Sequence, residues 1–252
     1  MAITAAMVKE LREMTGAGMM DCKKALNETN GNMDEAVEFL RKNGQAKAEK
    51  KASRIAAEGL CMVVTKDDQT AAVVEVNSET DFVAKNATFQ EFVKAVATQA
   101  VNSDAADMDA FMAEKWNEDA SKTVSEALVE KVAVIGENLK IRRFEKVVAE
   151  HGCVVPYVHG GGRIGVIVDA DTDVVNDTVK EAMHNIAMQI AALNPKYVSR
   201  DEVSADYIAH EKEILLAQIM NDPKESQKPE KVINGMIEGR ISKELKEICL
   251  VD

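Results

Sequence analysis

The sequence predicts an α+β fold, and three observations lead to this prediction. Apolar residues recur at helical spacing towards both ends of the chain, paired β-branched runs mark strands between them, and one strand-to-helix pattern occurs twice. The predicted fold has an N-terminal three-helix module, two pseudo-repeated α+β core halves with antiparallel sheets, and a C-terminal antiparallel helical hairpin. The corresponding ranges are 1–43 for the module, 44–57 for a basic helical linker, 58–150 and 151–194 for the core halves, and 195–252 for the hairpin.

Three short helices are expected in residues 1–43. Helical spacing predicts their inner faces, which are Met7, Val8, Leu11 and Met14 in the first, Cys22, Ala25 and Leu26 in the second, and Ala36, Val37 and Leu40 in the third. Gly16 is predicted to end the first helix and Asn43–Gly44 the third, because glycine tolerates the backbone of a helix C-terminus. Met19 and Met20 fall in the turn before the second helix. They form either an adaptable docking surface or a pair of which one packs on the bundle.

The next hundred residues are expected to form the first core half. Residues 45–57 are rich in Ala and Lys and predict a basic helical connector, and strands follow at 60–65 and 71–76 around a polar turn. Phe89, Phe92, Val93, Val96 and Ala97 then mark the apolar face of a helix. Residues 102–122 are acidic and weakly periodic, which predicts a loosely held loop with one short helix near 108–116 and leaves Trp116 open between core and surface. A helix at 124–135 and a strand at 141–148 complete this half.

The remaining residues predict the second core half and the hairpin. Strands at 153–158 and 164–168 flank a glycine-rich turn, and a helix at 176–193 follows with Val179, Met183, Ile186 and Ile190 as its inner face. Asn194–Pro195 ends this helix, since the residue before a proline is disfavoured in a helix. Two amphipathic helices come after it, marked by Tyr207, Ile208, Leu215 and Ile219, and by Ile233, Ile237, Ile241, Leu245 and Ile248. Breaks at 221–223 and at Pro229 predict an antiparallel hairpin.

Composition limits the function. The 252 residues are 46% hydrophobic, which is enough for a buried core. The formal net charge of −12 argues against generic nucleic-acid binding, because phosphate contacts need clustered Lys and Arg. Residues 1–56 carry ten basic and eight acidic residues, so the negative charge lies in the remainder of the chain. Four widely spaced cysteines, no signal peptide and no apolar run that could span a membrane predict a cytoplasmic protein with reduced thiols.

The repeated pattern is the most informative stretch. Thr80-Asp81-Phe82-Val83 aligns with Thr172-Asp173-Val174-Val175 at an offset of 173 − 81 = 92 residues, and we refer to these segments as the first corner and the second corner. Thr80 or Asp81 is expected to cap the helix that begins at the first corner. Phe82 is either a core staple for that helix or a ring kept for a contact with a partner. Val174 at the equivalent position favours a special task for Phe82 and a packing role for itself.

Two motifs carry a specific resemblance. They are Thr80-Asp81-Phe82-Val83-Ala84-Lys85 and the run from Leu11 to Leu26, LREMTGAGMMDCKKAL. Together with matches at 135–138, Arg142-Arg143, His159-Gly160 and 163–165, they make the chain similar to the elongation factor Ts family over its whole length. The N-terminal module resembles a ubiquitin-associated domain, a fold known for docking. The family comprises the bacterial nucleotide-exchange factors of the GTPase elongation factor Tu.

The resemblance implies an exchange factor and not an enzyme. It implies that the chain binds the GDP form of elongation factor Tu, displaces its magnesium with the Asp81–Phe82 corner and promotes GDP release. The region that acts on the magnesium of the partner would be Thr80, Asp81, Phe82 and Val83, and the partner-binding residues would be Arg12, Met19, Met20, Lys23 and His159. No cofactor, metal or directly bound nucleotide is implied for the chain itself. Family members usually continue beyond the hairpin, so a truncated chain is also expected.

Shorter motifs suggest other functions. The run from Gly160 to Gly165 is a literal G-x-G-x-x-G, but it is predicted to open a strand, whereas a dinucleotide site needs a helix there. Asp169, Asp171 and Asp173 alternate as in a calcium loop, but Val174 and Lys180 stand where that loop needs Gly and Glu. A docking adaptor with no effect on nucleotide release stays open as the alternative function.

Overall fold

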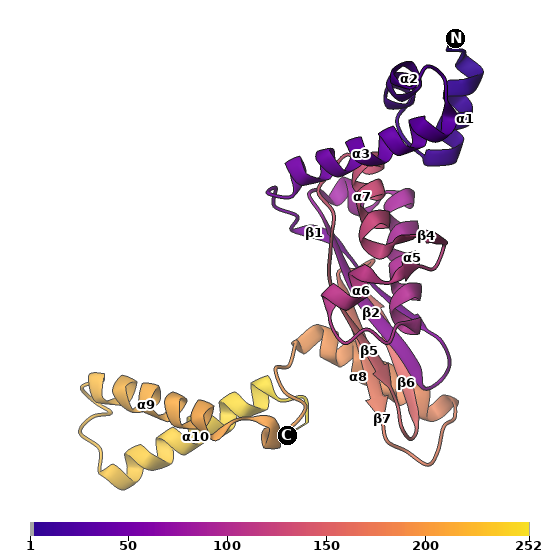
Figure 1. Cartoon of the computed structure of the whole chain (residues 1–252). Coiled ribbons are helices and arrows are strands. Elements are labelled where there is room, and N and C mark those ends of the chain that lie inside the picture. Colours follow the sequence, from indigo (N-terminus) through magenta and orange to yellow (C-terminus); the bar gives the residue numbers. More distant parts are fainter. Residues whose placement is uncertain (1–2, 252) are drawn as a thin grey trace. The chain divides into compact units, whose positions relative to one another are not determined.

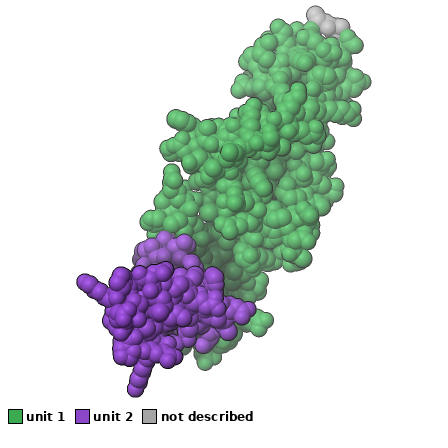
Figure 2. All heavy atoms as spheres, turned by 90° about the vertical axis from the view of Figure 1, so that its left-hand side faces the viewer, with its two compact units in different colours: residues 1–187 green, residues 188–252 purple. Residues whose placement is uncertain are grey.

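The computed structural model describes residues 3–251, so Met1, Ala2 and Asp252 of the predicted module and hairpin lie outside the described part. The chain divides into two compact units, residues 1–187 and residues 188–252 (Figure 2). The first unit contains the N-terminal module and most of both core halves, and the second contains the hairpin. The mixed α+β architecture predicted from the sequence is confirmed.

Three helices form the N-terminal module: α1 (Ala5–Thr15), α2 (Met19–Glu28) and α3 (Met33–Lys51) (Figure 1). The backbone N–H of Met7 donates to Thr4 Oγ1 at 3.3 Å, which caps α1, and Gly16 ends it with a φ of 66°. The predicted inner faces are largely confirmed, since Val8, Leu11, Cys22, Ala25, Leu26 and Ala36 form one buried cluster. Met14 is an exception, because its side chain is exposed.

The prediction that the third helix ends at Asn43–Gly44 is wrong. Helix α3 continues through the predicted boundary at residue 44 as far as Lys51. Gly44 is buried, and a Cβ placed on it would lie 3.5 Å from the Cβ of Ala133 in α7. Glycine inside a helix costs about 1 kcal/mol relative to alanine, and packing against α7 offsets this cost. Helix α3 therefore extends from the module along α7, but the predicted helical linker is helical only as far as Lys51, because residues 52–57 form a turn and an irregular segment before the first strand.

An antiparallel three-stranded sheet is the centre of the first core half. Its strands are β1 (Glu58–Thr65), β2 (Thr70–Ser78) and β5 (Lys140–Val148), in the order β1-β2-β5. Helix α5 (Ala87–Asn102) packs on this sheet and α7 (Val124–Ile135) packs on α5. All five residues predicted for the inner face of α5 are buried.

The prediction of a loosely held loop at residues 102–122 is wrong. This segment contains helix α6 (Met108–Ala113) and strands β3 (Lys115–Trp116) and β4 (Asp119–Thr123). Trp116 belongs to the core, with its ring centroid 5.9 Å from that of Phe92. The Glu114 carboxylate accepts hydrogen bonds from the buried side chains of Gln99 at 2.9 Å and Ser103 at 2.6 Å. These contacts explain the order of an acidic segment.

The second core half is smaller. Strands β6 (Cys153–His159) and β7 (Ile164–Ala170) form a two-stranded sheet, and helix α8 (Asp177–Leu193) follows. Met183 is buried in α8 as predicted, but Ile186 is exposed and the small Ala187 is buried instead. The two halves meet along β1, where the N–H of Cys61 donates to the carbonyl of Gly162 at 2.6 Å.

The hairpin consists of α9 (Ala205–Asn221) and α10 (Glu230–Ile248), with the 3₁₀ turn η1 (Arg200–Glu202) before them. Tyr207 Oη donates to Glu244 at 2.6 Å, and Lys212 pairs with Glu238 at 2.6 Å. Residues further along α9 therefore contact residues earlier in α10, so the two helices are antiparallel, as predicted. Its buried cluster is Val203, Ile219, Ile233, Ile237, Ile241, Leu245 and Cys249. Over residues 3–251, none of the helices combines the length and apolar character that a membrane crossing requires.

Candidate functional site

The first corner joins β2 to the one-turn helix α4 (Asp81–Ala84). Thr80 is the N-cap, because its Oγ1 accepts the N–H of Val83 at 3.4 Å. Of the two caps that the sequence allowed, the structure therefore selects Thr80. Ala84 is buried and Val83 is partly buried, so these two residues hold the short helix on the core.

Phe82 points away from the core. Its side chain is 81% exposed, which contradicts the hypothesis that it staples the first helical turn. Transferring a large apolar side chain from water to a buried contact gains about 1.5–3 kcal/mol. An exposed phenylalanine in the first turn of a capped helix thus offers apolar surface to a second molecule.

Glu137 holds the backbone of the first corner in place. It follows Gly136, the residue with φ of 87° that ends α7. Its carboxylate accepts three hydrogen bonds, from the N–H of Glu79 at 3.0 Å, the N–H of Thr80 at 3.0 Å and the Oγ1 of Thr80 at 2.7 Å. In return, the N–H of Asn138 donates to Glu79 Oε1 at 2.6 Å. We refer to Glu79, Glu137 and Asn138 as the corner brace.

The corner brace is a feature that sequence reasoning misses. Residues 135–138 carry no local pattern which indicates that Glu137 contacts Thr80, 57 positions earlier. An acidic residue directly after a helix-ending glycine is the one signal in the sequence. That signal is weak, since such positions are commonly solvated.

Asp81 is paired with Lys85 one helical turn later, at 2.7 Å. The hydrogen bond from Lys85 lowers the pKa of Asp81, with a smaller contribution from Arg163 in the turn between β6 and β7. Asp81 therefore stays ionised at neutral pH.

His159 is the last residue of β6, directly before the glycine turn that leads to β7. Gly160, Gly161 and Gly162 all have positive φ, and a Cβ on Gly162 would lie 2.7 Å from Leu60 Cδ2 and 3.1 Å from the Cys61 carbonyl. The glycines thus allow the turn to lie directly on β1. His159 is exposed, with its Nδ1 2.8 Å from Tyr157 Oη. The run that resembles a dinucleotide motif leads into β7, as expected.

The residues that the sequence predicts for docking lie in the N-terminal module, on α1 and α2. Met19 and Met20 are 60% and 73% exposed, and they occupy the first turn of α2 and not the preceding loop. Arg12 and Lys23 are also exposed. Lys23 follows Met19 by one helical turn, so an apolar and a cationic group share one face of α2.

The second corner differs from the first. No helix starts within it, and α8 begins only at Asp177. Val174 is 53% exposed, so the packing role predicted for it is wrong. His151 pairs with Asp171 through Nδ1 and with Asp173 through Nε2 at 3.2 Å, and the hydrogen bond from Asp171 raises the pKa of His151. Within residues 3–251, no group of three or more His, Cys, Asp or Glu side chains is arranged to hold a metal ion.

Comparison with known proteins places these features in a family. The family profile described as "Elongation factor TS" matches residues 79–252. The chain is 54% identical over 251 residues to "Elongation factor Ts" of Clostridioides difficile (strain 630), an alignment that covers 99% of this chain and 80% of that protein. It is 49% identical to the protein of the same name from Clostridium novyi (strain NT), covering 99% and 81% of the two chains. For the protein of that name from Halothermothrix orenii, identity is 47% over 253 residues, covering 100% of this chain and 83% of the other.

Proposed function

The chain belongs to the elongation factor Ts family, and from this premise we propose that it binds the GDP form of elongation factor Tu and accelerates GDP release through the first corner. An exchange factor breaks no covalent bond, so the proposed activity is not enzymatic. The site of action expected for it is the cytoplasm, where translation elongation takes place.

The observation that carries the proposal is the exposed ring of Phe82 on a backbone held by the corner brace. A ring on a mobile loop would lose conformational entropy on binding, whereas a ring on a fixed backbone keeps more of its contact energy. The proposal is that Thr80, Asp81, Phe82 and Val83 enter beside the nucleotide pocket of the partner. There the ring displaces groups that hold the bound magnesium, and the phosphates of GDP lose part of their coordination.

Such a mechanism couples two binding sites on the partner. If the chain weakens GDP binding by a given factor, GDP weakens binding of the chain by the same factor. Each tenfold acceleration of release requires the barrier to fall by about 1.4 kcal/mol. An acceleration of several decades therefore requires about 4 kcal/mol or more, which one aromatic anchor at an interface can supply.

The N-terminal module supplies a second contact in this proposal. Met19 and Met20 present apolar surface, and Arg12 and Lys23 present positive charge beside it. Methionine side chains adapt to irregular apolar surfaces. Arg and Lys side chains can pair with acidic residues of the partner at the edge of such a surface. His159, exposed at the turn on β1, is proposed as a peripheral contact near the first corner. Peripheral contacts usually contribute about 1 kcal/mol or less.

The decisive experiment is stopped-flow release of a fluorescent GDP analogue from elongation factor Tu. With increasing amounts of the chain, the release rate should rise to a plateau well above the spontaneous rate. Calorimetry with nucleotide-free elongation factor Tu measures binding independently. Binding without any acceleration of release would establish the docking adaptor, the alternative function, in place of an exchange factor.

A further inference from the structure

The junction between the N-terminal module and the core has a construction of its own. Helix α3 crosses α7 at Gly44, where a Cβ would lie 3.5 Å from the Cβ of Ala133. The turn between α1 and α2 reaches the same helix, since a Cβ on Gly16 would lie 3.6 Å from Val134 Cγ2. The module therefore contacts α7 at two separate places.

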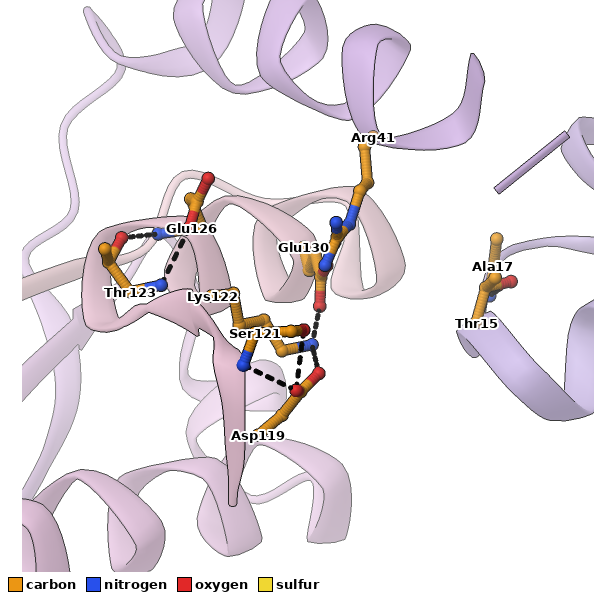
Figure 3. A network of polar contacts seen from close by, with 9 residues as sticks. All are labelled: Thr15, Ala17, Arg41, Asp119, Ser121, Lys122, Thr123, Glu126 and Glu130. Atoms are coloured by element: carbon orange, nitrogen blue, oxygen red, sulfur yellow. Dashed lines mark hydrogen bonds and ion pairs between the residues drawn. The ribbon is translucent and has the colours of Figure 1, made fainter. Parts of the chain in front are cut away.

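A chain of ion pairs crosses this junction. Figure 3 shows Arg41 extending from α3 towards Glu130 of α7, with Lys122 and Asp119 of β4 on the other side of Glu130. Arg41 Nε lies 3.4 Å from Glu130 Oε1, Lys122 Nζ pairs with Glu130 Oε2, and Lys122 Nζ lies 3.3 Å from Asp119 Oδ2. We refer to these four residues as the junction network.

Lys122 is the most enclosed member of the junction network. Its side chain is 16% exposed. Burial alone would lower the pKa of Lys122, but its hydrogen bonds to Glu130 and Asp119 outweigh this and raise the pKa. Two hydrogen bonds from Ser121 hold Asp119 ionised and lower its pKa to about 2. Lys122 and Asp119 are thus both charged at neutral pH.

A solvent-accessible pocket lies beside these contacts. It has a volume of about 310 Å³ and lies between α3, α7 and the turn between α1 and α2, with Leu40, Val129 and Ala133 among its apolar lining. Where this pocket separates the module from the core, side chains of the two parts make no direct van der Waals contact. The orientation of the module therefore depends strongly on the two helix contacts and on the junction network.

We propose that Glu130, held between Arg41 and Lys122, is a positioning residue that fixes the docking surface of the module relative to the first corner. This inference rests on the proposed exchange function. Two contact sites on one rigid frame reinforce each other, because binding at the first raises the effective concentration of the second. If the module can turn on the core, docking no longer brings Phe82 to its target. A smaller fraction of the bound complexes then has Phe82 in position, so a higher concentration of the chain is needed to reach the same rate of GDP release.

Glu130→Gln tests the proposal, because it removes the charge and keeps the size of the side chain. The concentration of factor needed for half-maximal GDP release should rise about two- to fivefold, the range expected for loss of partly exposed ion pairs. The plateau rate at saturating factor should stay unchanged, since the first corner is intact. Glu38→Gln is the matched control, because Glu38 pairs with Lys42 within α3 and its pair does not cross the junction.

A reversible crosslink separates positioning from a general loss of stability. In Gly44→Cys/Ala133→Cys the two Cβ atoms would start 3.5 Å apart, within the range of about 3.5–4.5 Å found in disulfides. When oxidised, the double-cysteine variant should need the same concentration for half-maximal GDP release whether or not it also carries Glu130→Gln. When reduced, it should show the two- to fivefold difference again. A difference that persists in the oxidised form would overturn the proposal.

Arg41→Gln provides a second route if the crosslinked variant does not fold. It should raise the half-maximal concentration like Glu130→Gln, and the double variant should be no worse than the more affected single variant, because both residues belong to one interaction. Unchanged half-maximal concentrations in both single variants would also overturn the proposal. A parent chain that fails to accelerate release at all would instead refute the proposed function.

Discussion

The first and the second corner share a sequence pattern and differ in what surrounds them. Both place a threonine and an aspartate after a strand, and both leave the next side chain exposed, Phe82 in one and Val174 in the other. In the first corner Thr80 caps a helix and Glu137 accepts three hydrogen bonds from Glu79 and Thr80. In the second, Thr172 Oγ1 accepts only the N–H of Val174, at 3.1 Å, and the surface histidine His151 ties the neighbouring aspartates.

The difference has a topological origin. Glu137 and Asn138 of the corner brace come from the connection between α7 and β5, and the sheet of the second half has two strands where the main sheet of the first half has three. Without a helix and a third strand beside it, the second corner has no neighbouring segment to supply a residue like Glu137. The comparison therefore indicates that the surrounding structure, more than the four-residue pattern, determines whether the backbone of a corner is held in place.

Moving the aromatic ring from one corner to the other should have the largest effect. In Phe82→Val, the plateau rate of GDP release should fall about thirtyfold or more, because loss of a central aromatic anchor costs about 2 kcal/mol or more. Adding Val174→Phe to this variant should restore nothing. Val174→Ala alone is the matched control and should change stability by no more than about 0.5 kcal/mol, since Val174 lies on the surface. A plateau rate equal to that of the parent in folded Phe82→Val would rule out insertion of the ring.

Removing the corner brace should have the next largest effect. Glu137→Ala leaves two backbone N–H groups and a hydroxyl without their acceptor, so the free energy of unfolding should fall by about 1–3 kcal/mol. The plateau rate should fall about tenfold although Phe82 is still present, because the ring is no longer held in position. Denaturant unfolding and stopped-flow release measure the two effects. His151→Ala, which frees the second corner, is the control and should leave the plateau rate unchanged.

A smaller effect is expected from the charge beside the ring. Asp81→Ala removes the pair with Lys85 but leaves the cap residue Thr80 and the corner brace in place. The plateau rate should fall about two- to threefold, because an exposed pair contributes little to the position of the ring. A loss as large as that of Phe82→Val would show that the carboxylate itself acts on the partner. Lys85→Ala distinguishes the pair from the carboxylate alone, since it keeps Asp81.

The smallest effect should come from a change in pH. It should alter only the stability that the ion pairs of His151 contribute at the second corner. The pKa of His151 is raised in the folded chain, so its pairs contribute stability that is fully present below about pH 6.5, the unfolded pKa, and is lost as pH rises through the folded pKa. A proton NMR titration should give a midpoint above 6.5 that returns to about 6.5 in Asp171→Asn/Asp173→Asn. The pKa of Asp81 is lowered, so the first corner keeps its charge over the same range and the plateau rate should not follow this titration.

The sequence predicted most of the elements because their apolar patterns are local. The inner face of α5, the strands of both halves and the antiparallel hairpin follow from spacing alone. Prediction from the sequence failed where contacts between residues far apart in the chain determine the local structure. Gly44 stays helical because Ala133 lies against it, and Trp116 is buried because Phe92 and the neighbouring elements enclose it.

The candidate site shows the same division. The pattern around Phe82 located the first corner, but a four-residue pattern cannot show whether its ring points inwards, and the exposure of the ring required the structure. Neither the corner brace nor the junction network was predicted from the sequence. Their partners lie 57 and 89 positions apart in the chain, in the pairs Thr80–Glu137 and Arg41–Glu130, and one charged residue on a helix or loop has no signature of such a partner.

The two ends of the hairpin are fastened to each other. The N–H of Leu250 donates to the carbonyl of Tyr197 at 2.9 Å, and the N–H of Val251 donates to that of Val198 at 2.9 Å. These two hydrogen bonds close the base of the segment between them. A segment whose two ends are hydrogen-bonded to each other can change in length without separating those ends, as insertions between adjacent points of a chain do. The length of the hairpin can therefore vary while the contacts of Tyr197 and Val198 at its base stay in place.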